Sequence, residues 1–464
     1  MSSRRFLPVL IAGAQQPFGA ASDPENGGFD LARAGYVEEE YLLEGAAGFW
    51  ISGAVGEPTR EGTTVPYRTR VLVRYPSDRR SASGVTHVEP LHPHMDAGLT
   101  WEALSAHLIR RGDAWVGVTV YPHVAELMRE RIDPARYGAL VVPAGGAEWD
   151  IFSDALEAVR HDEFGALRAS RIVISGRSAT GSFCRVFARE RFVTARGGLA
   201  DAVGIFISSG GAGLAGYPLL SSASPAVPAD DARRTVRDVG IPVFEVLSET
   251  ESETHRAQLR DDSDEPGDVY RLFQIAGSAH IEEWPAARSN NAARLAAAGA
   301  DTGPIAVREQ RSDARSDLIS RALMDHLIGA ANGGVAPRAP RFVYNDGEVP
   351  VHQLLRRDAD GNVVGGIRSP WVQAPLAAYA PHGTPQDGDG EGPEWTPLAD
   401  RALAAGLVGT MAAFSSAEAV RRYGDVDEYL RQFEAATGDL VDAGLLLAAD
   451  APELNATAPG RWRE

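Results

Sequence analysis

The chain has 464 residues, a formal charge of −18 at pH 7 and one cysteine, Cys184. A single cysteine excludes an internal disulfide framework and any cysteine-ligated zinc or iron–sulfur centre. The acidic balance argues against a nucleic-acid partner, because affinity for phosphate backbones comes largely from basic surface. The sequence also lacks an apolar run of about 20 residues, so we expect no membrane span.

The N-terminal region is predicted to be rich in strands. The apolar run Phe6–Ile11 follows two arginines and predicts a first strand, although a weak signal peptide has a similar composition; we expect a cytoplasmic protein. Gly35–Leu43 is an aromatic stretch in which Glu38–Glu40 predicts either a charged sheet edge or a site of buried ion pairs. Tyr67–Arg74 alternates in polarity, which is typical of a half-buried strand.

From residue 85 onward, short apolar strands alternate with helices. The predicted strands are Val85–Leu91, Ala114–Val120, Arg171–Ser175, Ala202–Ser208, Pro242–Leu247 and Val269–Ala276. The predicted helices are Thr100–Arg111, Trp149–His161, Ala179–Arg191 and Asp313–Leu327. This alternation predicts an α/β fold with a mostly parallel central sheet that is covered by helices on both faces.

The chain is expected to consist of one main domain with insertions and a C-terminal extension. Residues 1–335 are expected to form a catalytic domain, with insertions near 122–147 and 209–239 that are long enough to act as lids. The acidic run Asp261–Asp268 is predicted to be a solvated loop. Residues 336–464 are expected to form a C-terminal extension packed on the core: a strand-and-turn region, a linker-like run at 385–393, and a mainly helical tail over 395–456.

The strongest chemical signal is the run from Ile172 to Gly181, in which a strand leads through Gly176 and Ser178 into a helix. This strand–turn–helix context is that of a nucleophile elbow, where a strained turn exposes the serine. The helix begins at Ala179, and its free N–H groups can stabilise an oxyanion. The usual second glycine is displaced by one position, because Thr180 occupies its place.

A nucleophilic serine needs a base and an acid that orients the base. In proteins with a nucleophile elbow, the acid follows the serine in the sequence and the histidine follows the acid. Glu251 lies at the best offset beyond the strand Pro242–Leu247, and Glu249 and Glu253 are close rivals. His280 follows the next strand on a loop of small residues, as a base requires.

The oxyanion hole should use the N–H of Ala179 and a second N–H from the loop after Val85–Leu91. Because Pro93 has no N–H, the second donor is expected to be His92 or Leu91. His94 and Arg177 are expected at the substrate pocket. His92, His94 and Asp96 also resemble part of a dinuclear zinc site, but the further histidine that such a site needs is replaced by Ala97. We therefore expect no metal and no cofactor.

Several stretches resemble the bacterial alpha/beta hydrolase domain-containing family, a group of large α/β-hydrolase enzymes. They are Gly35–Tyr41, Val88–Leu91, His107–Gly117, Gly176–Gly181, Leu247–Glu251, Gly277–His280 and Gly365–Trp371. The Gly-x-Ser-x-Thr-Gly elbow is the form this family uses, and the resemblance implies a triad of Ser178, Glu251 and His280. At residues 90–94 the chain departs from the family, which more often has a Trp-Leu-Asn-like run.

The expected function is a serine esterase that acts on small-molecule carboxylic esters through an acyl-enzyme intermediate. Activity should fall at acid pH, because His280 must be neutral to act as a base. An acyltransferase with the same triad is the first alternative, and a non-catalytic binding protein on a hydrolase scaffold is the second. Neither the natural substrate nor the oligomeric state is fixed by these patterns.

Overall fold

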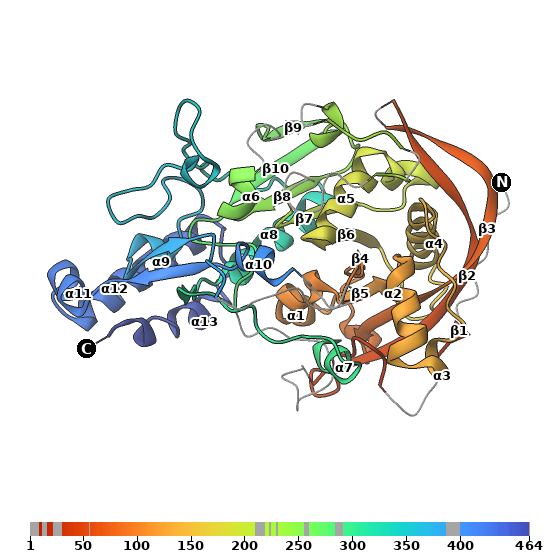
Figure 1. Cartoon of the computed structure of the whole chain (residues 1–464), viewed down its shortest axis with the longest axis horizontal. Coiled ribbons are helices and arrows are strands. Elements are labelled where there is room, and N and C mark those ends of the chain that lie inside the picture. The colour runs from red at the N-terminus through yellow and green to blue at the C-terminus, as the bar shows by residue number, and fades with distance from the viewer. Residues whose placement is uncertain are drawn as a thin grey trace.

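The protein was analysed as a computed structural model. The structure describes residues 9–11, 16–21, 30–54, 56–208, 219–221, 224–228, 231–254, 259–283, 291–386 and 400–463. Its centre is a ten-stranded sheet with the order β1-β2-β3-β5-β4-β6-β7-β8-β10-β9 (Figure 1).

Six neighbouring strands of this sheet are parallel. They are β5 (Ala114–Val118), β4 (Val85–Pro90), β6 (Arg171–Arg177), β7 (Ala202–Phe206), β8 (Val243–Leu247) and β10 (Asp268–Gln274). Each is short and almost fully buried, as expected for strands covered on both faces. Because the strands run in one direction, their carboxyl ends meet at one edge, which is where the candidate site lies.

Helices cover both faces, which confirms the predicted α/β architecture. α1 (Leu99–Arg111) and α8 (Ser316–Ala331) pack together on one face, and α4 (Glu148–Arg160) and α5 (Ala179–Arg189) lie on the other. Each face has its own apolar core. One contains Trp149, Phe152, Phe183 and Phe187, and the other contains Trp101, Leu108, Leu318 and Leu323.

The N-terminal strands are longer than their apolar patterns predict. β2 (Tyr36–Ala54) and β3 (Glu57–Pro76) form a long antiparallel hairpin, beside which β1 (Val9–Leu10) pairs. The first half of β3 is mostly exposed and polar, so its sequence has no alternating apolar pattern that would predict a strand. Pairing with β2 extends the strand there. The Glu38–Glu40 cluster is a site of buried ion pairs, since Glu38 binds Arg74 and Glu40 binds Arg70.

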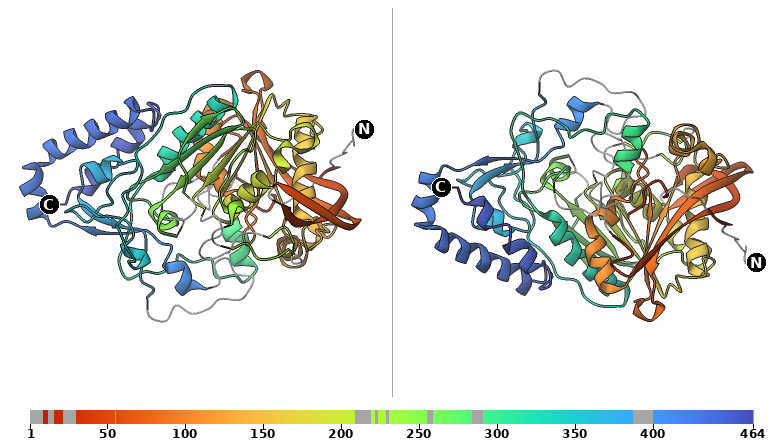
Figure 2. Two further views of the ribbon diagram at one scale, coloured as in Figure 1. Left: turned by 90° about the horizontal axis from the view of Figure 1, so that it is seen from above. Right: turned by 90° about the horizontal axis from the view of Figure 1, so that it is seen from below.

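The C-terminal residues form a small sheet and a group of helices at the end of the molecule opposite the β2–β3 hairpin (Figures 1 and 2). The sheet has the order β11-β13-β12. Its strands are β11 (Gln310–Arg311), β12 (Ala377–Ala380) and β13 (Thr410–Ala413). The helices at that end are α9 (Pro370–Gln373), α11 (Ser416–Tyr423), α12 (Val426–Asp442) and α13 (Ala451–Asn455), whereas α10 (Arg401–Ala405) lies nearer the middle of the molecule in Figure 1. The tail predicted as mainly helical therefore also contains a strand, because β13 pairs with residues far away in sequence.

The structure describes the two predicted insertions to different extents. The segment 122–147 holds α2 (Pro122–Leu127), a π-helical turn (Met128–Ile132) and α3 (Pro134–Tyr137), whereas residues 209–218, 222–223 and 229–230 of the second insertion lie outside the described part of the chain. The prediction of a solvated loop at Asp261–Asp268 is wrong. This run forms a hairpin of β9 (Ser263–Glu265) with β10, because its acidic side chains pair with arginines.

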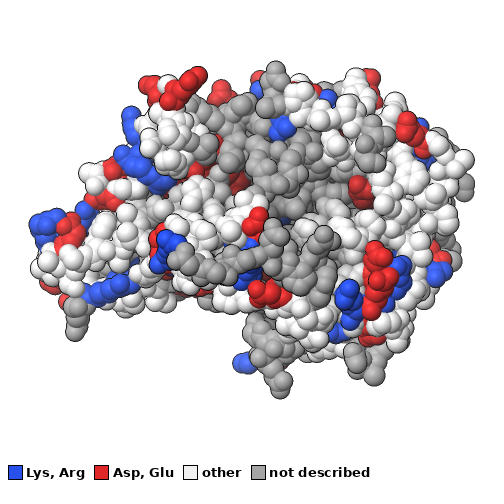
Figure 3. Space-filling view, viewed as in Figure 1, with Lys and Arg blue, Asp and Glu red and all other residues white. Residues whose placement is uncertain are grey.

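The remaining elements are α6 (Glu249–Thr254), α7 (Asn291–Ala297) and 3-10 turns at Arg79–Ser81, Phe192–Gly197, Ala232–Arg234, Val351–Gln353 and Pro459–Arg461. Among the described helices, we find none with the length and apolarity to cross a membrane. On the face in Figure 3, acidic and basic side chains are interspersed among uncharged ones.

Candidate active site

Ser178 occupies the sharp turn between β6 and α5. Its backbone has φ 60° and ψ −126°, a conformation that non-glycine residues rarely adopt. The Ser178 N–H donates to the carbonyl oxygens of Phe206 and Ile207, at 3.1 and 3.0 Å, which fixes the turn against the end of β7. The strained serine is thus held by its neighbouring strand, as a nucleophile elbow requires.

The displaced glycine of the elbow has a structural explanation. The Thr180 hydroxyl donates to the Arg177 carbonyl at 2.8 Å and accepts from the Arg177 N–H at 2.9 Å, so threonine bridges the turn. A Cβ on Gly176 would lie 2.2 Å from the Thr180 carbonyl oxygen, and one on Gly181 would lie 2.8 Å from the Ser208 Cβ. The close approaches therefore occur at positions 176 and 181, and position 180 has room for a side chain.

The structure brings Ser178, His280 and Glu251 together at the carboxyl edge of the sheet. The Ser178 Oγ lies 2.8 Å from the His280 Nε2, and the His280 Nδ1 lies 2.6 Å from the Glu251 Oε1. The carboxylate requires a proton on Nδ1, so Nε2 is free to accept the serine proton. Glu251 is buried, whereas His280 keeps 17% of its side chain exposed, as a base that meets a substrate needs.

Ser248 fixes the orientation of Glu251 at the start of α6. The Ser248 N–H donates to the Glu251 Oε2 at 3.2 Å, its hydroxyl binds the same oxygen, and the Thr250 N–H donates to the Ser248 Oγ at 3.1 Å. Ser248 thus caps α6 through the Thr250 N–H, and the Glu251 carboxylate reaches back to the Ser248 N–H as it does in a capping box. The Ser-x-x-Glu pattern at 248–251 is visible in the sequence, but Thr250 and Glu253 form a pattern of the same kind, so the pattern alone does not choose between the two glutamates.

The two rival glutamates bind other partners. Glu249 accepts the Gly277 N–H at 2.6 Å and pairs with Arg357 at 2.7 Å. Glu253 binds the His382 Nε2 at 2.5 Å. Sequence reasoning missed both Arg357 and His382, since they lie more than a hundred residues away and no local pattern links them to α6.

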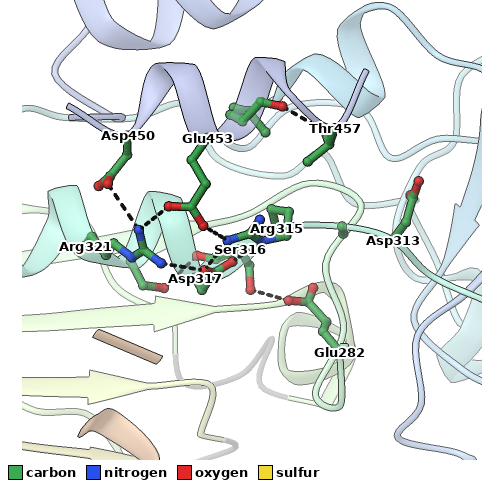
Figure 4. A network of polar contacts seen from close by, with 12 residues as sticks. Glu282, Asp313, Arg315, Ser316, Asp317, Arg321, Asp450, Glu453 and Thr457 are labelled. Carbon is green, nitrogen blue, oxygen red and sulfur yellow. Dashed lines mark hydrogen bonds and ion pairs between the residues drawn. The ribbon is translucent and has the colours of Figure 1, made fainter. Parts of the chain in front are cut away.

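Glu282 supports the loop that carries His280, and sequence reasoning missed it as well. Its Oε1 accepts the Ala279 N–H at 3.0 Å, and its Oε2 binds the hydroxyl of Ser316 at the start of α8 (Figure 4). Burial raises the pKa of Glu282 to about 7. Trp371 adds a second support from the C-terminal region, because its Nε1 donates to the Ala276 carbonyl at 3.2 Å.

The start of α8 is tied in turn to α13. Arg315 and Arg321 both bind Asp317 and Glu453, and Arg321 also binds Asp450 (Figure 4). The pairs with Asp450 and Glu453 join residues more than a hundred positions apart. The C-terminal segment therefore contacts the same helix end that supports the His280 loop.

The other predicted site residues differ in their surroundings. Ala179 is the first residue of α5, so its N–H has no partner within the helix. His94 is exposed, and its ring centroid lies 5.8 Å from that of His123. Arg177 is buried, and its guanidinium donates to the His280 carbonyl at 3.4 Å, so its side chain contacts the loop that carries His280.

The backbone N–H groups predicted as the second oxyanion donor have other acceptors. The His92 N–H donates to the Ala97 carbonyl at 3.0 Å, and the Leu91 N–H donates to the Val118 carbonyl at 2.8 Å. Neither predicted N–H is therefore free, because His92 closes the loop onto Ala97 and Leu91 continues the pairing of β4 with β5. Asp96, the third residue of the metal-like pattern, binds Arg70 at 2.8 Å and the Thr119 hydroxyl at 2.8 Å.

His382 provides a test of the contact between the C-terminal region and α6. Its Nδ1 lies 2.8 Å from the Gly406 carbonyl oxygen and its Nε2 lies 2.5 Å from the Glu253 carboxylate, so both ring nitrogens face acceptors. Burial lowers the pKa of His382, but the hydrogen bonds to Glu253 and Gly406 outweigh burial, and the pKa is raised. A raised pKa means that the stabilisation is complete below the unfolded value of about 6.5 and is lost as the pH rises through the higher folded value.

Between pH 6 and 9 we expect the Tm of the wild type to fall by about 1–2 °C more than that of His382→Gln, measured by calorimetry. The effect is small because the side chain is 35% exposed and solvent screens the pair. Parallel Tm curves for the two proteins would contradict the assignment.

The fold and the site together define a class of protein. A serine on a strand–turn–helix elbow, followed in sequence by an acid and a histidine at the ends of later parallel strands, is the arrangement of an α/β hydrolase. The chain belongs to the alpha/beta hydrolase domain family, whose sequence model matches residues 7–456. A comparison with curated proteins finds no significant match.

A comparison with solved structures finds similarity to esterases at low identity. The structure of esterase Est22 is 12% identical, covers 65% of this chain and 82% of its own, and has a TM-score of 0.36. An arylesterase structure is 12% identical over 45% of this chain and 72% of its own, with a TM-score of 0.30. A structure from a study of two fungal esterases from Rhizomucor miehei is 12% identical over 50% and 74%, with a TM-score of 0.28.

Proposed function

We propose that the protein is a serine hydrolase that cleaves carboxylic esters through a Ser178–His280–Glu251 triad. The observation that carries the proposal is the continuous pair of contacts from the Ser178 Oγ to the His280 Nε2, at 2.8 Å, and from the His280 Nδ1 to Glu251, at 2.6 Å. A serine hydroxyl is a weak nucleophile, and this geometry supplies the base that activates it.

In the proposed mechanism, His280 takes the proton from the Ser178 hydroxyl as the oxygen attacks the ester carbonyl. Glu251 holds the ring in the required tautomer and stabilises the imidazolium. The Ala179 N–H donates to the oxyanion. The tetrahedral intermediate collapses, His280 gives its proton to the leaving alcohol, and water then cleaves the acyl-enzyme with the same histidine as base.

The proposal extends to the organisation of the chain. Residues 1–335 are the catalytic domain, and the insertion near 122–147 shapes the substrate pocket. Residues 336–464 are an extension that supports the site, for which the contacts of Trp371 with Ala276 and of Arg357 with Glu249 are the evidence. The charge of −18 makes polyanionic substrates unfavourable, so uncharged esters are the expected class.

The test is a panel of p-nitrophenyl esters of increasing acyl length together with aromatic esters, assayed with the wild type. A fluorophosphonate probe should label Ser178 in parallel. Absence of both hydrolysis and labelling would favour a non-catalytic binding protein. Product analysis with a competing alcohol separates hydrolysis from acyl transfer, because a transferase would give the new ester in preference to the free acid.

A further inference from the structure

The loop after β4 places His92 near His280. β4 and β6 are parallel neighbours, with Val88 opposite Ile174, and end at Pro90 and Arg177. The loop from Leu91 and the turn at Ser178 therefore begin at the same edge of the sheet, where His92 is close enough to His280 for an electrostatic interaction between the two rings. The loop is fixed there, because the Asp96 N–H donates to the His92 carbonyl at 2.8 Å and the Asp96 carboxylate binds the buried Arg70.

The ring of His92 is held in one tautomer. Its Nδ1 accepts the His94 N–H at 3.2 Å, so in a neutral ring the proton sits on Nε2. Burial, with smaller contributions from neighbouring histidines that include His280, lowers the pKa of His92 to about 3. The ring therefore stays neutral at any pH at which the base could act.

The Nε2–H of this ring remains available. Across the described residues, we find no group that accepts a hydrogen bond from it, although the side chain is buried. The backbone N–H of His92 is already used by Ala97. A neutral donor that is buried and held in a fixed position is the kind of group that stabilises a developing oxyanion.

We propose that the His92 side chain, through its Nε2–H, donates the second hydrogen bond to the oxyanion, opposite the Ala179 N–H. This inference rests on the proposed ester hydrolysis. It replaces a backbone donor with a side-chain donor, which makes the second half of the oxyanion hole accessible to mutation.

Two substitutions at this position separate the donor from the packing. His92→Asn keeps an oxygen near the Nδ1 position to accept the His94 N–H but has nothing at the Nε2 position. His92→Gln instead places an amide N–H near Nε2. We expect His92→Asn to lower kcat about 100-fold or more with KM within about threefold, and His92→Gln to recover at least about tenfold of that loss.

The second readout is the affinity for a trifluoromethyl ketone, which forms a tetrahedral adduct with an oxyanion. Across wild type, His92→Asn and His92→Gln, its Kd should rise in proportion to the loss of kcat/KM. A merely structural role would lower the activity of both variants alike without that proportionality. An equal loss of activity in both variants without that proportionality would overturn the inference. An unchanged kcat in His92→Asn would overturn it as well.

The outcome is distinguishable from failure of the proposed function. If the wild type hydrolyses no ester and takes no fluorophosphonate label, the proposed function itself is wrong. If the wild type is active and labelled while His92→Asn matches it in kcat and in ketone affinity, only the role of His92 is wrong.

Discussion

Ser178→Ala is expected to lose at least about 1,000-fold in kcat on any ester that the wild type cleaves. The substitution removes the nucleophile and leaves the base and acid in place. Since the Ser178 Oγ contacts only His280 among the described side chains, the Tm should change little. Steady-state kinetics together with calorimetry would measure both quantities.

Ser182 is a matched control on the same helix. It lies one turn further along α5, where its hydroxyl binds that of Ser208 at 2.9 Å. Ser182→Ala removes the same atom from a buried site, at a cost of about 1 kcal/mol in stability, and should keep activity within a few fold. Near-wild-type hydrolysis by Ser178→Ala would contradict the proposed mechanism.

Glu251→Gln is expected to lower kcat by about 1,000- to 10,000-fold while the protein still folds. The carboxylate faces three donors, namely the Ser248 N–H, the Ser248 hydroxyl and the His280 Nδ1–H. An amide cannot accept from all of them. If its NH2 group faces His280, the ring must turn its proton to Nε2, and that nitrogen can no longer take the proton from Ser178.

The neighbouring glutamates make the comparison specific. Glu249→Gln and Glu253→Gln also remove buried carboxylates from α6. The partners of Glu249 are the Gly277 N–H and Arg357, and those of Glu253 are His382 and, at 3.9 Å, Arg357. We expect kcat to fall by less than about tenfold in both variants and the Tm of both to decrease. A loss in Glu249→Gln or Glu253→Gln as large as that in Glu251→Gln would assign the acid elsewhere.

Much of the sheet could be predicted because each central strand carries its own apolar run and is followed by a helix. The predicted strands at 85–91, 114–120 and 171–175 correspond to β4, β5 and β6 within a few residues. The candidate residues 178, 251 and 280 could be proposed because each directly follows such a strand, and parallel strands bring their ends together.

The supports of the site could not be predicted. Glu253 and His382 are 129 residues apart, and Ser316 reaches Glu282 from the start of another helix. A polar side chain carries no periodic signal of its partner, because pairing is decided by the packing of elements that are distant in sequence. The long β2–β3 hairpin and the ion-paired β9–β10 hairpin escaped prediction for the same reason.

The sequence alone determined the class of fold, the position of the serine elbow and the order of serine, acid and base, since these depend on local periodicity and on residues next to strand ends. Only the tertiary structure decided which of three glutamates meets His280, and that the His92 N–H already has an acceptor. Those outcomes depend on differences of a few ångströms between neighbouring groups, which are set by how the loops close and not by residue type. Composition and charge excluded other classes of protein. The packing of loops and helices at the carboxyl edge of the sheet determined the hydrogen-bond partners of the site residues.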